Sequence, residues 1–180
     1  MSYALRIMDG AVHGWAGLLA RLVTGGVWIV AGALKVTDPT ASIEAVKAYE
    51  LMPYSVAEVV GLALPALELV VGLTLVVGAL TRGAAVVSAL LFVAFIVGIA
   101  SVWARGIEID CGCFGGGGAE EGAASSYPWE IARDAALLAA SVYVAALRRT
   151  RLALDNLLFP GRTAQASPEQ EHHEHQEQGS

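Results

Sequence analysis

An uncharged stretch at residues 84–104 constrains the fold of this chain more than any other feature. Its sequence, AAVVSALLFVAFIVGIASVWA, runs for 21 residues without a charged side chain. As an α-helix it would be ~30 Å long, which is the thickness of the hydrocarbon core of a bilayer. A core helix of a soluble protein normally keeps a polar stripe over such a length. The stretch therefore predicts a transmembrane helix.

The composition agrees with a chain that lies in a lipid bilayer. The 180 residues are 56% hydrophobic and only 16% charged, whereas soluble domains average about 45–50% and about 25%. A soluble domain of this size would need more charge on its surface. The net charge of −6 owes much to the four glutamates of residues 169–177. Because the sequence has no basic stripe, we expect no nucleic-acid partner.

Two further apolar segments precede this one. Residues 59–80 carry a single charge, Glu68. Residues 17–34 contain Arg21 and several glycines, and glycines let membrane helices approach one another closely. A cleaved signal peptide is the alternative for this first segment, because residues 31–33 (Ala-Gly-Ala) resemble a cleavage site. The charge of Arg21 within the apolar run favours a retained helix.

A fourth segment, residues 128–148, is less apolar. Pro128 suits the first turn of a helix, where its missing N–H costs nothing. Only residues 135–147 are free of charge, and this length is too short to cross a bilayer. A crossing helix must therefore include Arg133 and Asp134, placed at the interface or facing inward.

Together these segments predict an all-α protein. Residues 1–160 are expected to form a four-helix transmembrane bundle with helices at about 17–36, 57–80, 84–104 and 128–148. Residues 161–180 are rich in Gln, Glu, His and Ser. Such a composition cannot bury enough apolar surface to fold, so a disordered, acidic and His-containing C-terminal tail is predicted.

The distribution of basic residues predicts the orientation of the bundle. In a four-helix arrangement, one side of the membrane receives Arg6, Arg82, Arg148, Arg149, Arg151 and Arg162. The loops on the other side carry Lys35, Lys47 and Arg105 among many acidic residues. Because cytoplasmic loops are rich in Lys and Arg, both termini are predicted to be cytoplasmic and the two longer loops to lie outside.

The two cysteines of the chain are Cys111 and Cys113, in the run Asp-Cys-Gly-Cys-Phe-Gly of residues 110–115. The predicted orientation places them outside the cytoplasm, where disulfides persist. A disulfide across one residue needs a tight turn, which Gly112 permits, and strained or exposed disulfides are often the labile or catalytic ones. A short loop gains little stability from a disulfide. The pattern therefore favours redox chemistry over a surface loop without chemistry.

Neighbouring charges and metals bear on the same motif. Asp110 and Glu108 should raise the pKa of a nearby thiol, whereas Arg105 or the start of the fourth helix should lower it. Metal binding is an alternative, since two thiolates could hold a soft ion such as Cu(I). Zinc would need four ligands, and the tail histidines are predicted on the opposite side of the membrane. We therefore predict no resident metal.

Charged residues inside the apolar segments are costly in lipid and usually have a function. Arg21 would lie near the cytoplasmic end of the first helix, where its side chain could extend to the interface. Glu68 would lie near the middle of the second helix, where we expect it to pair with another helix. Lys35, Glu58, Arg133 and Asp134 fall toward the side of the cysteines. The supporting polar residues predicted for the site are Arg21, Lys35, Glu68, Asp110, Arg133 and Asp134.

Several short pieces of the sequence together resemble a known family. They are residues 31–35 (Ala-Gly-Ala-Leu-Lys), 38–39 (Asp-Pro), 49–53 (Tyr-Glu-Leu-Met-Pro), 65–68 (Pro-Ala-Leu-Glu), 110–115 and 133–134 (Arg-Asp). Over residues 18–147 the chain resembles the DoxX-like membrane proteins, and within them the methylamine-utilisation (MauE) branch. The resemblance implies a four-helix, multi-pass protein of the bacterial plasma membrane. It also implies thiol redox work outside the cytoplasm, often beside thioredoxin-like partners.

Two functional hypotheses follow. In the first, Cys111 and Cys113 exchange electrons with a thioredoxin-fold or exported thiol protein, which would make the chain a thiol–disulfide oxidoreductase. Membrane bundles of the vitamin K epoxide reductase type use two cysteine pairs and a quinone. With one pair, this chain would have to exchange directly with a quinone or borrow thiols from a partner. In the second, the chain is a non-catalytic subunit that assembles a membrane complex through small-residue faces, such as those of Gly25, Gly72 and Gly78.

Overall fold

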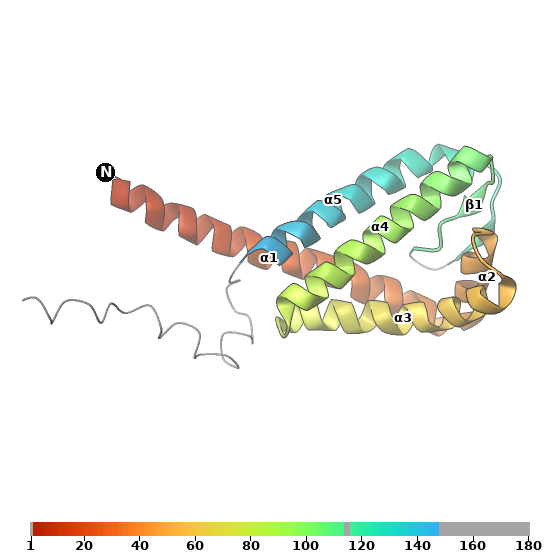
Figure 1. The fold of residues 1–180 in the computed structure, drawn as a ribbon, viewed down its shortest axis with the longest axis horizontal. Coiled ribbons are helices and arrows are strands. Elements are labelled where there is room, and N and C mark those ends of the chain that lie inside the picture. Colours follow the sequence, from red (N-terminus) through yellow and green to blue (C-terminus); the bar gives the residue numbers. More distant parts are fainter. Residues whose placement is uncertain (1, 114–115, 148–180) are drawn as a thin grey trace, which may run out of the picture.

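The computed structural model describes residues 2–113 and 116–147, which are mostly helical. The helices are α1 (Ser2–Thr37), α2 (Pro39–Ala48), α3 (Tyr54–Val77), α4 (Thr81–Arg105) and α5 (Tyr127–Ala146) (Figure 1). Between α4 and α5 lie the two-residue strands β1 (Ile109–Asp110) and β2 (Gly118–Ala119), which pair in an antiparallel hairpin, and the short 3₁₀ helix η1 (Ala123–Ser125).

The four long helices pack side by side. α1 lies along α3 and α4 lies along α5, and contacts of α1 with α5 and of α3 with α4 close the arrangement. The short α2 rests on α3 and also contacts β2. α2 and the hairpin lie at one end of the molecule, where α1 and α4 end and α3 and α5 begin (Figure 1). One end of the helices therefore carries nearly all the irregular structure.

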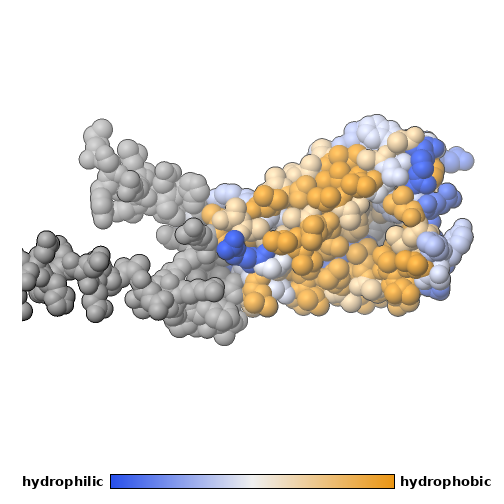
Figure 2. Space-filling model, in the orientation of Figure 1, coloured by the Kyte–Doolittle hydropathy of each residue, from blue (hydrophilic) through white to orange (hydrophobic). Residues whose placement is uncertain are grey.

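Three helices of the described chain are long and apolar enough to cross a membrane. They are the part of α1 from Gly14 to Thr37, α3 and α4. Figure 2 shows a broad hydrophobic band along the helices, with hydrophilic residues gathered at the end that carries α2 and the hairpin. Large apolar side chains such as Leu19, Val59, Val70 and Leu90 are exposed on these helices. Such a surface is stable against lipid rather than against water, so the chain is a membrane protein with several apolar helices.

The helix bounds differ from the sequence expectations at several points. α1 begins at Ser2 rather than near residue 17, and α3 spans Tyr54–Val77 rather than residues 57–80. α3 ends where Gly78 adopts a left-handed conformation, with φ of 78°, which glycine takes without strain. The hairpin adds a little β structure to a fold predicted as all-α. The predicted tail at residues 161–180 and the arginines beyond residue 147 lie outside the described residues.

α2 was not predicted from the sequence, although its start has a clear local signal. Asp38 caps the helix, because its Oδ1 accepts a hydrogen bond of 3.0 Å from the backbone N–H of Ala41. Pro39 follows at the first helical position, where a proline is favoured. Only ten residues long, α2 lacks the sustained apolar run by which the longer helices were found.

Glycines allow α1 and α3 to pack closely. A Cβ atom on Gly72 would lie 2.8 Å from the carbonyl oxygen of Gly25, and one on Gly32 would lie 2.9 Å from that of Pro65. Gly25 and Gly72 are therefore internal packing positions and not a free face for a partner. Gly32 belongs to residues 31–33, the segment weighed as a cleavage site, and here it lies within the contact between two helices.

A chain of polar contacts links three helices inside the apolar core. The indole Nε1 of Trp28 on α1 donates a hydrogen bond of 2.7 Å to Ser88 Oγ on α4. Ser88 Oγ lies 2.9 Å from Ser141 Oγ on α5. The ring of Trp28 also packs on Phe92, with 4.5 Å between ring centroids. Because each polar group has a partner, this contact fixes the helices relative to one another at little desolvation cost.

The glycine contact generates a stability prediction. Replacing Gly72 by Ala should force α1 and α3 apart and cost about 1–3 kcal/mol, as expected for overpacking a tight contact. Gly26 is the matched control, because a Cβ there meets no atom within 4 Å. Thermal unfolding in detergent should show a clear loss of Tm for Gly72→Ala and little change for Gly26→Ala. Equal effects of the two changes would contradict the assigned contact.

Candidate functional site

The segment that carries the cysteines is held on α5 by a buried tyrosine. The hydroxyl of Tyr127, in the first turn of α5, accepts a hydrogen bond of 2.8 Å from the backbone N–H of Ile109. The same hydroxyl lies 3.0 Å from the carbonyl oxygens of Ile107 and Ile109, to one of which it donates. Tyr127 is 1% exposed. Strand β1, which leads directly into Cys111, is therefore fixed in position by the start of α5.

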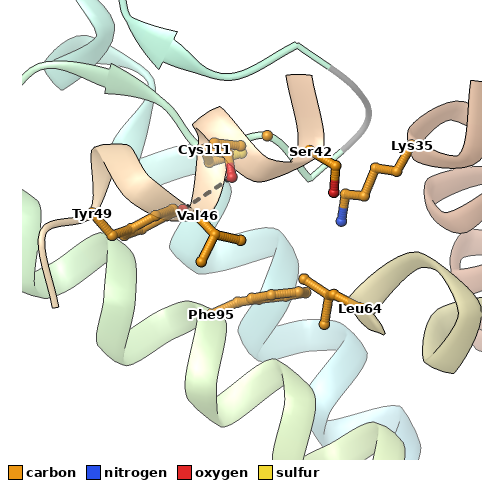
Figure 3. A pocket seen from close by; sticks show the side chains of 9 residues that line it. Lys35, Ser42, Val46, Tyr49, Leu64, Phe95 and Cys111 are labelled. Atoms are coloured by element: carbon orange, nitrogen blue, oxygen red, sulfur yellow. Dashed lines mark hydrogen bonds between the residues drawn. The ribbon is translucent and has the colours of Figure 1, made fainter. Parts of the chain in front are cut away.

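A second tyrosine holds the same segment from the side of α2. Tyr49, which follows α2, donates a hydrogen bond of 3.0 Å from its hydroxyl to the carbonyl oxygen of Cys111 (Figure 3). The guanidinium of Arg105, at the end of α4, donates to the carbonyl oxygen of Tyr49. Burial raises the pKa of Tyr49, and the neighbouring cysteines raise it further. The hydroxyl of Tyr49 therefore stays protonated and remains a donor.

Small residues bring the cysteine segment into direct contact with α2. A Cβ on Gly112 would lie 2.6 Å from the Cβ of Ala45, and one on Gly117 would lie 2.3 Å from the same atom. Gly112 also has a φ of 65°, a conformation that glycine adopts readily. Gly112 thus serves both the turn between the cysteines and the close approach to α2.

The two cysteines are free thiols in different environments. Cys111 is partly exposed and Cys113 is 7% exposed. The backbone N–H of Cys113 points to Cys111 Sγ at 3.4 Å. Asp110 stabilises the turn, because its Oδ1 accepts a hydrogen bond of 2.9 Å from the N–H of Gly112. The thiol-bearing residue Cys111 is therefore partly exposed, while Cys113 is buried.

The pKa values of the two thiols diverge for the same structural reason. The hydrogen bond from the Cys113 thiol, and after it the Cys113 backbone N–H, lowers the pKa of Cys111. The hydrogen bond to Cys111, then burial, then the Cys111 charge raise the pKa of Cys113. A thiolate at Cys111 with a thiol at Cys113 is thus the favoured singly ionised state.

The charges that act on the cysteines come mainly from α5 and α1. Glu130 raises and Arg133 lowers the pKa of Cys111, while Asp134 raises and Lys35 lowers that of Cys113. From the sequence, shifts in the pKa values of the cysteines were expected from Glu108, Asp110 and Arg105. In the structure Glu108 instead accepts a hydrogen bond from the N–H of Gly122, and Arg105 binds the backbone at Tyr49.

A buried ion pair lies next to the cysteine segment. Lys35 Nζ, at the end of α1, lies 2.5 Å from Glu68 Oε1 on α3, and the two side chains are 5% and 0% exposed. Lys35 also lies over the ring of Phe95, 5.4 Å from its centroid. Glu68 thus pairs between helices, as the sequence analysis expected. This pairing offsets the high cost of each charge in a membrane interior.

A second ion pair lies on α5. Arg133 donates to Asp134 Oδ1, with both Nε and Nη2 at 2.9 Å from that oxygen. Asp134 is 2% exposed, whereas Arg133 is only partly buried. Asp134 Oδ2 is buried and has no hydrogen-bond partner among the described residues. Asp134 therefore faces inward, and Arg133 lies between it and the surface.

Arg21 and Glu58 do not join this cluster. Arg21 is 1% exposed, so the expectation that it extends to the interface is wrong. It lies about four turns of α1 from Lys35, with Thr24 and Trp28 buried along the same face. Glu58 is exposed at the start of α3. The structure thus brings together Lys35, Glu68, Asp110, Arg133 and Asp134 around the cysteines and leaves Arg21 elsewhere.

A small cavity separates the first ion pair from the cysteine segment. Its volume is about 30 Å³, which suits one or two water molecules. Figure 3 shows Lys35 and Ser42 reaching toward it from α1 and α2, with Tyr49 and Phe95 on its other walls. Its lining is completed by Ala45, Val46, Leu64, Cys111 and Gly112. Lys35 and Cys111 therefore border the same small cavity.

Metal ligands do not gather around this cavity in the described part of the chain. There, no group of three or more His, Cys, Asp or Glu side chains is placed to hold a metal ion.

Sequence reasoning missed the residues that position the cysteines. Tyr49, Tyr127 and Ala45 all lie outside the cysteine motif and contact it only because α2 and α5 fold against the hairpin. Tyr49 belongs to the Tyr-Glu-Leu-Met-Pro piece already linked to a family, which was the available signal. Tyr127 and the Pro128 that follows it predicted only the start of a helix.

Comparison with known proteins identifies the family. No curated protein and no solved structure matches the chain. The family model for the methylamine utilisation protein MauE matches residues 13–147. This range covers the membrane helices and the whole of the cysteine site. The chain therefore belongs to the MauE family of membrane proteins involved in methylamine utilisation.

Proposed function

We propose that this chain is a membrane thiol–disulfide redox protein that exchanges electrons with a thioredoxin-fold or other exported thiol protein. The observation that carries the proposal is the asymmetry of the cysteine pair. Cys111 is partly exposed with a lowered pKa, whereas Cys113 is buried with a raised pKa. Thiol–disulfide exchange needs an accessible thiolate to attack and a second thiol held beside it to complete the exchange.

The proposed exchange has two steps. The Cys111 thiolate attacks one sulfur of a partner disulfide, so a mixed disulfide forms and the other partner sulfur leaves as a thiolate. Cys113 then attacks Cys111 Sγ and loses its proton, and the remaining partner sulfur leaves. The Cys111–Cys113 disulfide forms, and two electrons pass to the partner, which becomes a dithiol. The reverse sequence oxidises a partner dithiol, so the reduction potentials of the two proteins set the direction.

The proposed topology is a four-helix crossing of the bacterial plasma membrane. α5 has 20 residues, or ~30 Å, which is enough to span the hydrocarbon core. Its outward face consists of small apolar residues such as Ala132, Ala135 and Ala139, while Asp134 faces inward. With four crossings, both termini lie in the cytoplasm and the cysteine segment lies outside, in agreement with the distribution of arginines.

A protein thiol is favoured over a quinone as the electron partner. The cavity beside Cys111, at about 30 Å³, has no room for a quinone ring, since small-molecule pockets are usually about 300 Å³ or larger. Cys111 is partly exposed and can be reached by a partner sulfur. A direct exchange with a quinone would need a binding site elsewhere on the lipid-facing surface.

Cysteine variants test the proposed function. With Cys113 replaced by Ser, Cys111 can attack but the mixed disulfide cannot be resolved, so a covalent complex with the partner should accumulate. Acid-quenched membranes analysed by non-reducing electrophoresis and mass spectrometry would detect it. The matched control is Cys111→Ser, which leaves only the buried thiol and should trap little or nothing.

The second candidate, a non-catalytic assembly subunit, makes the opposite prediction. Cys111→Ser and Cys113→Ser would then both support full methylamine utilisation in a deletion strain, and neither would trap a partner. This result would overturn the redox proposal.

The pKa asymmetry can be tested separately from the partner. Because a hydrogen bond from residue 113 stabilises the Cys111 thiolate, Cys113→Ala should raise the pKa of Cys111, whereas Cys113→Ser keeps a donor and should raise it less. The pH dependence of alkylation by iodoacetamide, read by mass spectrometry, measures this pKa. Alkylation should become fast at lower pH in Cys113→Ser than in Cys113→Ala. Identical pH profiles of alkylation in the two variants would show that the Cys113 side chain does not stabilise the Cys111 thiolate.

Labelling of intact cells tests the topology. A membrane-impermeant maleimide added from outside should modify Cys111 after mild reduction. The control is Arg82→Cys in a Cys111→Ser/Cys113→Ser background, because Arg82 is exposed in the turn at the opposite end of the helices. It should react only after the membrane is permeabilised. The reverse pattern would place the cysteines in the cytoplasm.

A further inference from the structure

The peptide unit that joins Cys111 to Gly112 is held at both of its polar groups by side chains. Its carbonyl oxygen accepts a hydrogen bond of 3.0 Å from the hydroxyl of Tyr49, and its N–H donates one of 2.9 Å to Asp110 Oδ1. We propose that Tyr49 and Asp110 are positioning residues, which fix this peptide unit so that the backbone N–H of Cys113 points to Cys111 Sγ. This inference rests on the proposed function, because it concerns the thiol that makes the first attack.

Few rotations separate the two cysteines. Because peptide bonds are planar, only ψ of Cys111 and the φ and ψ of Gly112 determine where the Cys113 N–H lies relative to the Cys111 backbone. This N–H lies 3.4 Å from Cys111 Sγ. A fixed orientation of the peptide unit between Cys111 and Gly112 constrains the first two of these rotations. The two hydrogen bonds on that unit therefore act directly on the geometry of the contact with sulfur.

Gly112 cannot hold this geometry by itself. Its φ of 65° is reached by glycine without strain, but glycine also populates many other conformations. A stiffer residue does not fit, because a Cβ at this position would lie 2.6 Å from the Cβ of Ala45. The centre of the turn is therefore a permissive residue, and the shape of the turn comes from the side chains that bind its backbone.

Tyr49 is itself fixed by α4. Its carbonyl oxygen accepts a hydrogen bond from the guanidinium of Arg105, at the end of that helix. Its ring lies close to the helix backbone, because a Cβ on Gly98 would be 3.1 Å from Tyr49 Cε1. Figure 3 shows the hydroxyl of Tyr49 directed toward Cys111. The hydroxyl thus holds the cysteine turn at a set position relative to α4.

The carboxylate of Asp110 fits closely into the same turn. Its Oδ1 accepts from the Gly112 N–H, and a Cβ on Gly116 would lie 2.6 Å from its Oδ2. Residue 116 therefore leaves room for this carboxylate because it is a glycine. From the sequence, Asp110 was expected to act through its charge and raise the pKa of a nearby thiol. The hydrogen bond gives it a geometric role, which predicts the opposite effect on Cys111.

The orientation of the Cys113 N–H matters for the first step of the exchange. A hydrogen bond to the charged form of a thiol lowers its pKa, and the backbone N–H of Cys113 contributes to the lowered pKa of Cys111. A turn that lost this orientation would hold less Cys111 thiolate at the same pH. The first attack would then slow, because the thiolate is the nucleophile.

The role of Tyr49 is tested with Tyr49→Phe, which removes the hydroxyl and keeps the ring. The variant is made in a Cys113→Ala background, where Cys111 is the only thiol and residue 113 has only its N–H as a donor. The pKa of Cys111, measured by the pH dependence of alkylation with iodoacetamide, should rise by about half to one pH unit. This corresponds to about three- to tenfold slower alkylation below the pKa. Tyr54→Phe, at a tyrosine that is 73% exposed, is the matched control and should change nothing.

The role of Asp110 is tested by comparing Asp110→Asn with Asp110→Ala in the same background. Both variants remove the charge, but only the asparagine keeps an oxygen that can accept from the Gly112 N–H. The pKa of Cys111 should therefore be higher in Asp110→Ala than in Asp110→Asn, by about half to one pH unit. If Asp110 acted through its charge alone, both variants would lower this pKa equally.

The outcomes of these tests are distinct from those of the proposed function. Thermal unfolding in detergent establishes that each variant is folded before its pKa is compared. A folded Tyr49→Phe protein with the pH profile of Tyr54→Phe, or equal profiles of the two Asp110 variants, would overturn the inference. These measurements need no partner protein. Failure of the proposed function would appear instead as no partner complex with Cys113→Ser in membranes.

Discussion

The cost of charge inside a membrane determines the arrangement of this protein. Lys35 and Glu68 lie on different helices and are both almost fully buried, so each is tolerated because the other lies 2.5 Å away. The pair therefore fixes the end of α1 against the middle of α3. α5 also carries a buried charge, Asp134, which faces inward and pairs with Arg133. Both ion pairs lie next to the cysteine segment, at the polar end of the bundle.

Residues at this polar end of the bundle also hold the cysteine segment in place. Its backbone is held by Tyr127 from α5 and by Tyr49 from α2, and its glycines lie directly on Ala45. These contacts leave Cys111 partly exposed and Cys113 buried. The difference in pKa between the two thiols follows from that placement, because the hydrogen bond between them lowers the pKa of Cys111 and raises that of Cys113, and burial raises the pKa of Cys113 further. A looser loop would expose both thiols equally and remove the asymmetry.

The sequence predicted the parts of this molecule that follow from local pattern. The uncharged run within α4 identified a membrane helix, Glu68 was expected to pair between helices, and the likeness to MauE is confirmed by the family model. α2 was missed because a helix of ten residues has little periodicity to detect. Arg21 was misplaced at the interface because the sequence does not state which face of α1 is covered; in the structure that face is buried. Tyr49 and Tyr127 could not be found from the motif, because only the folded chain brings them to Cys111 and Ile109.

The small cavity limits what this site can receive. Lys35 and Cys111 border a space of about 30 Å³, which is filled by a water molecule or two. A small-molecule oxidant of quinone size therefore has no route to the sulfur through this space. Cys111, by contrast, is partly exposed, and the end of the molecule that carries α2 and the hairpin is hydrophilic (Figure 2). The proposed thiol exchange therefore uses the exposed side of Cys111 rather than this space. The membrane helices α1 and α3 hold the buried charges of Lys35 and Glu68 in place beside this space.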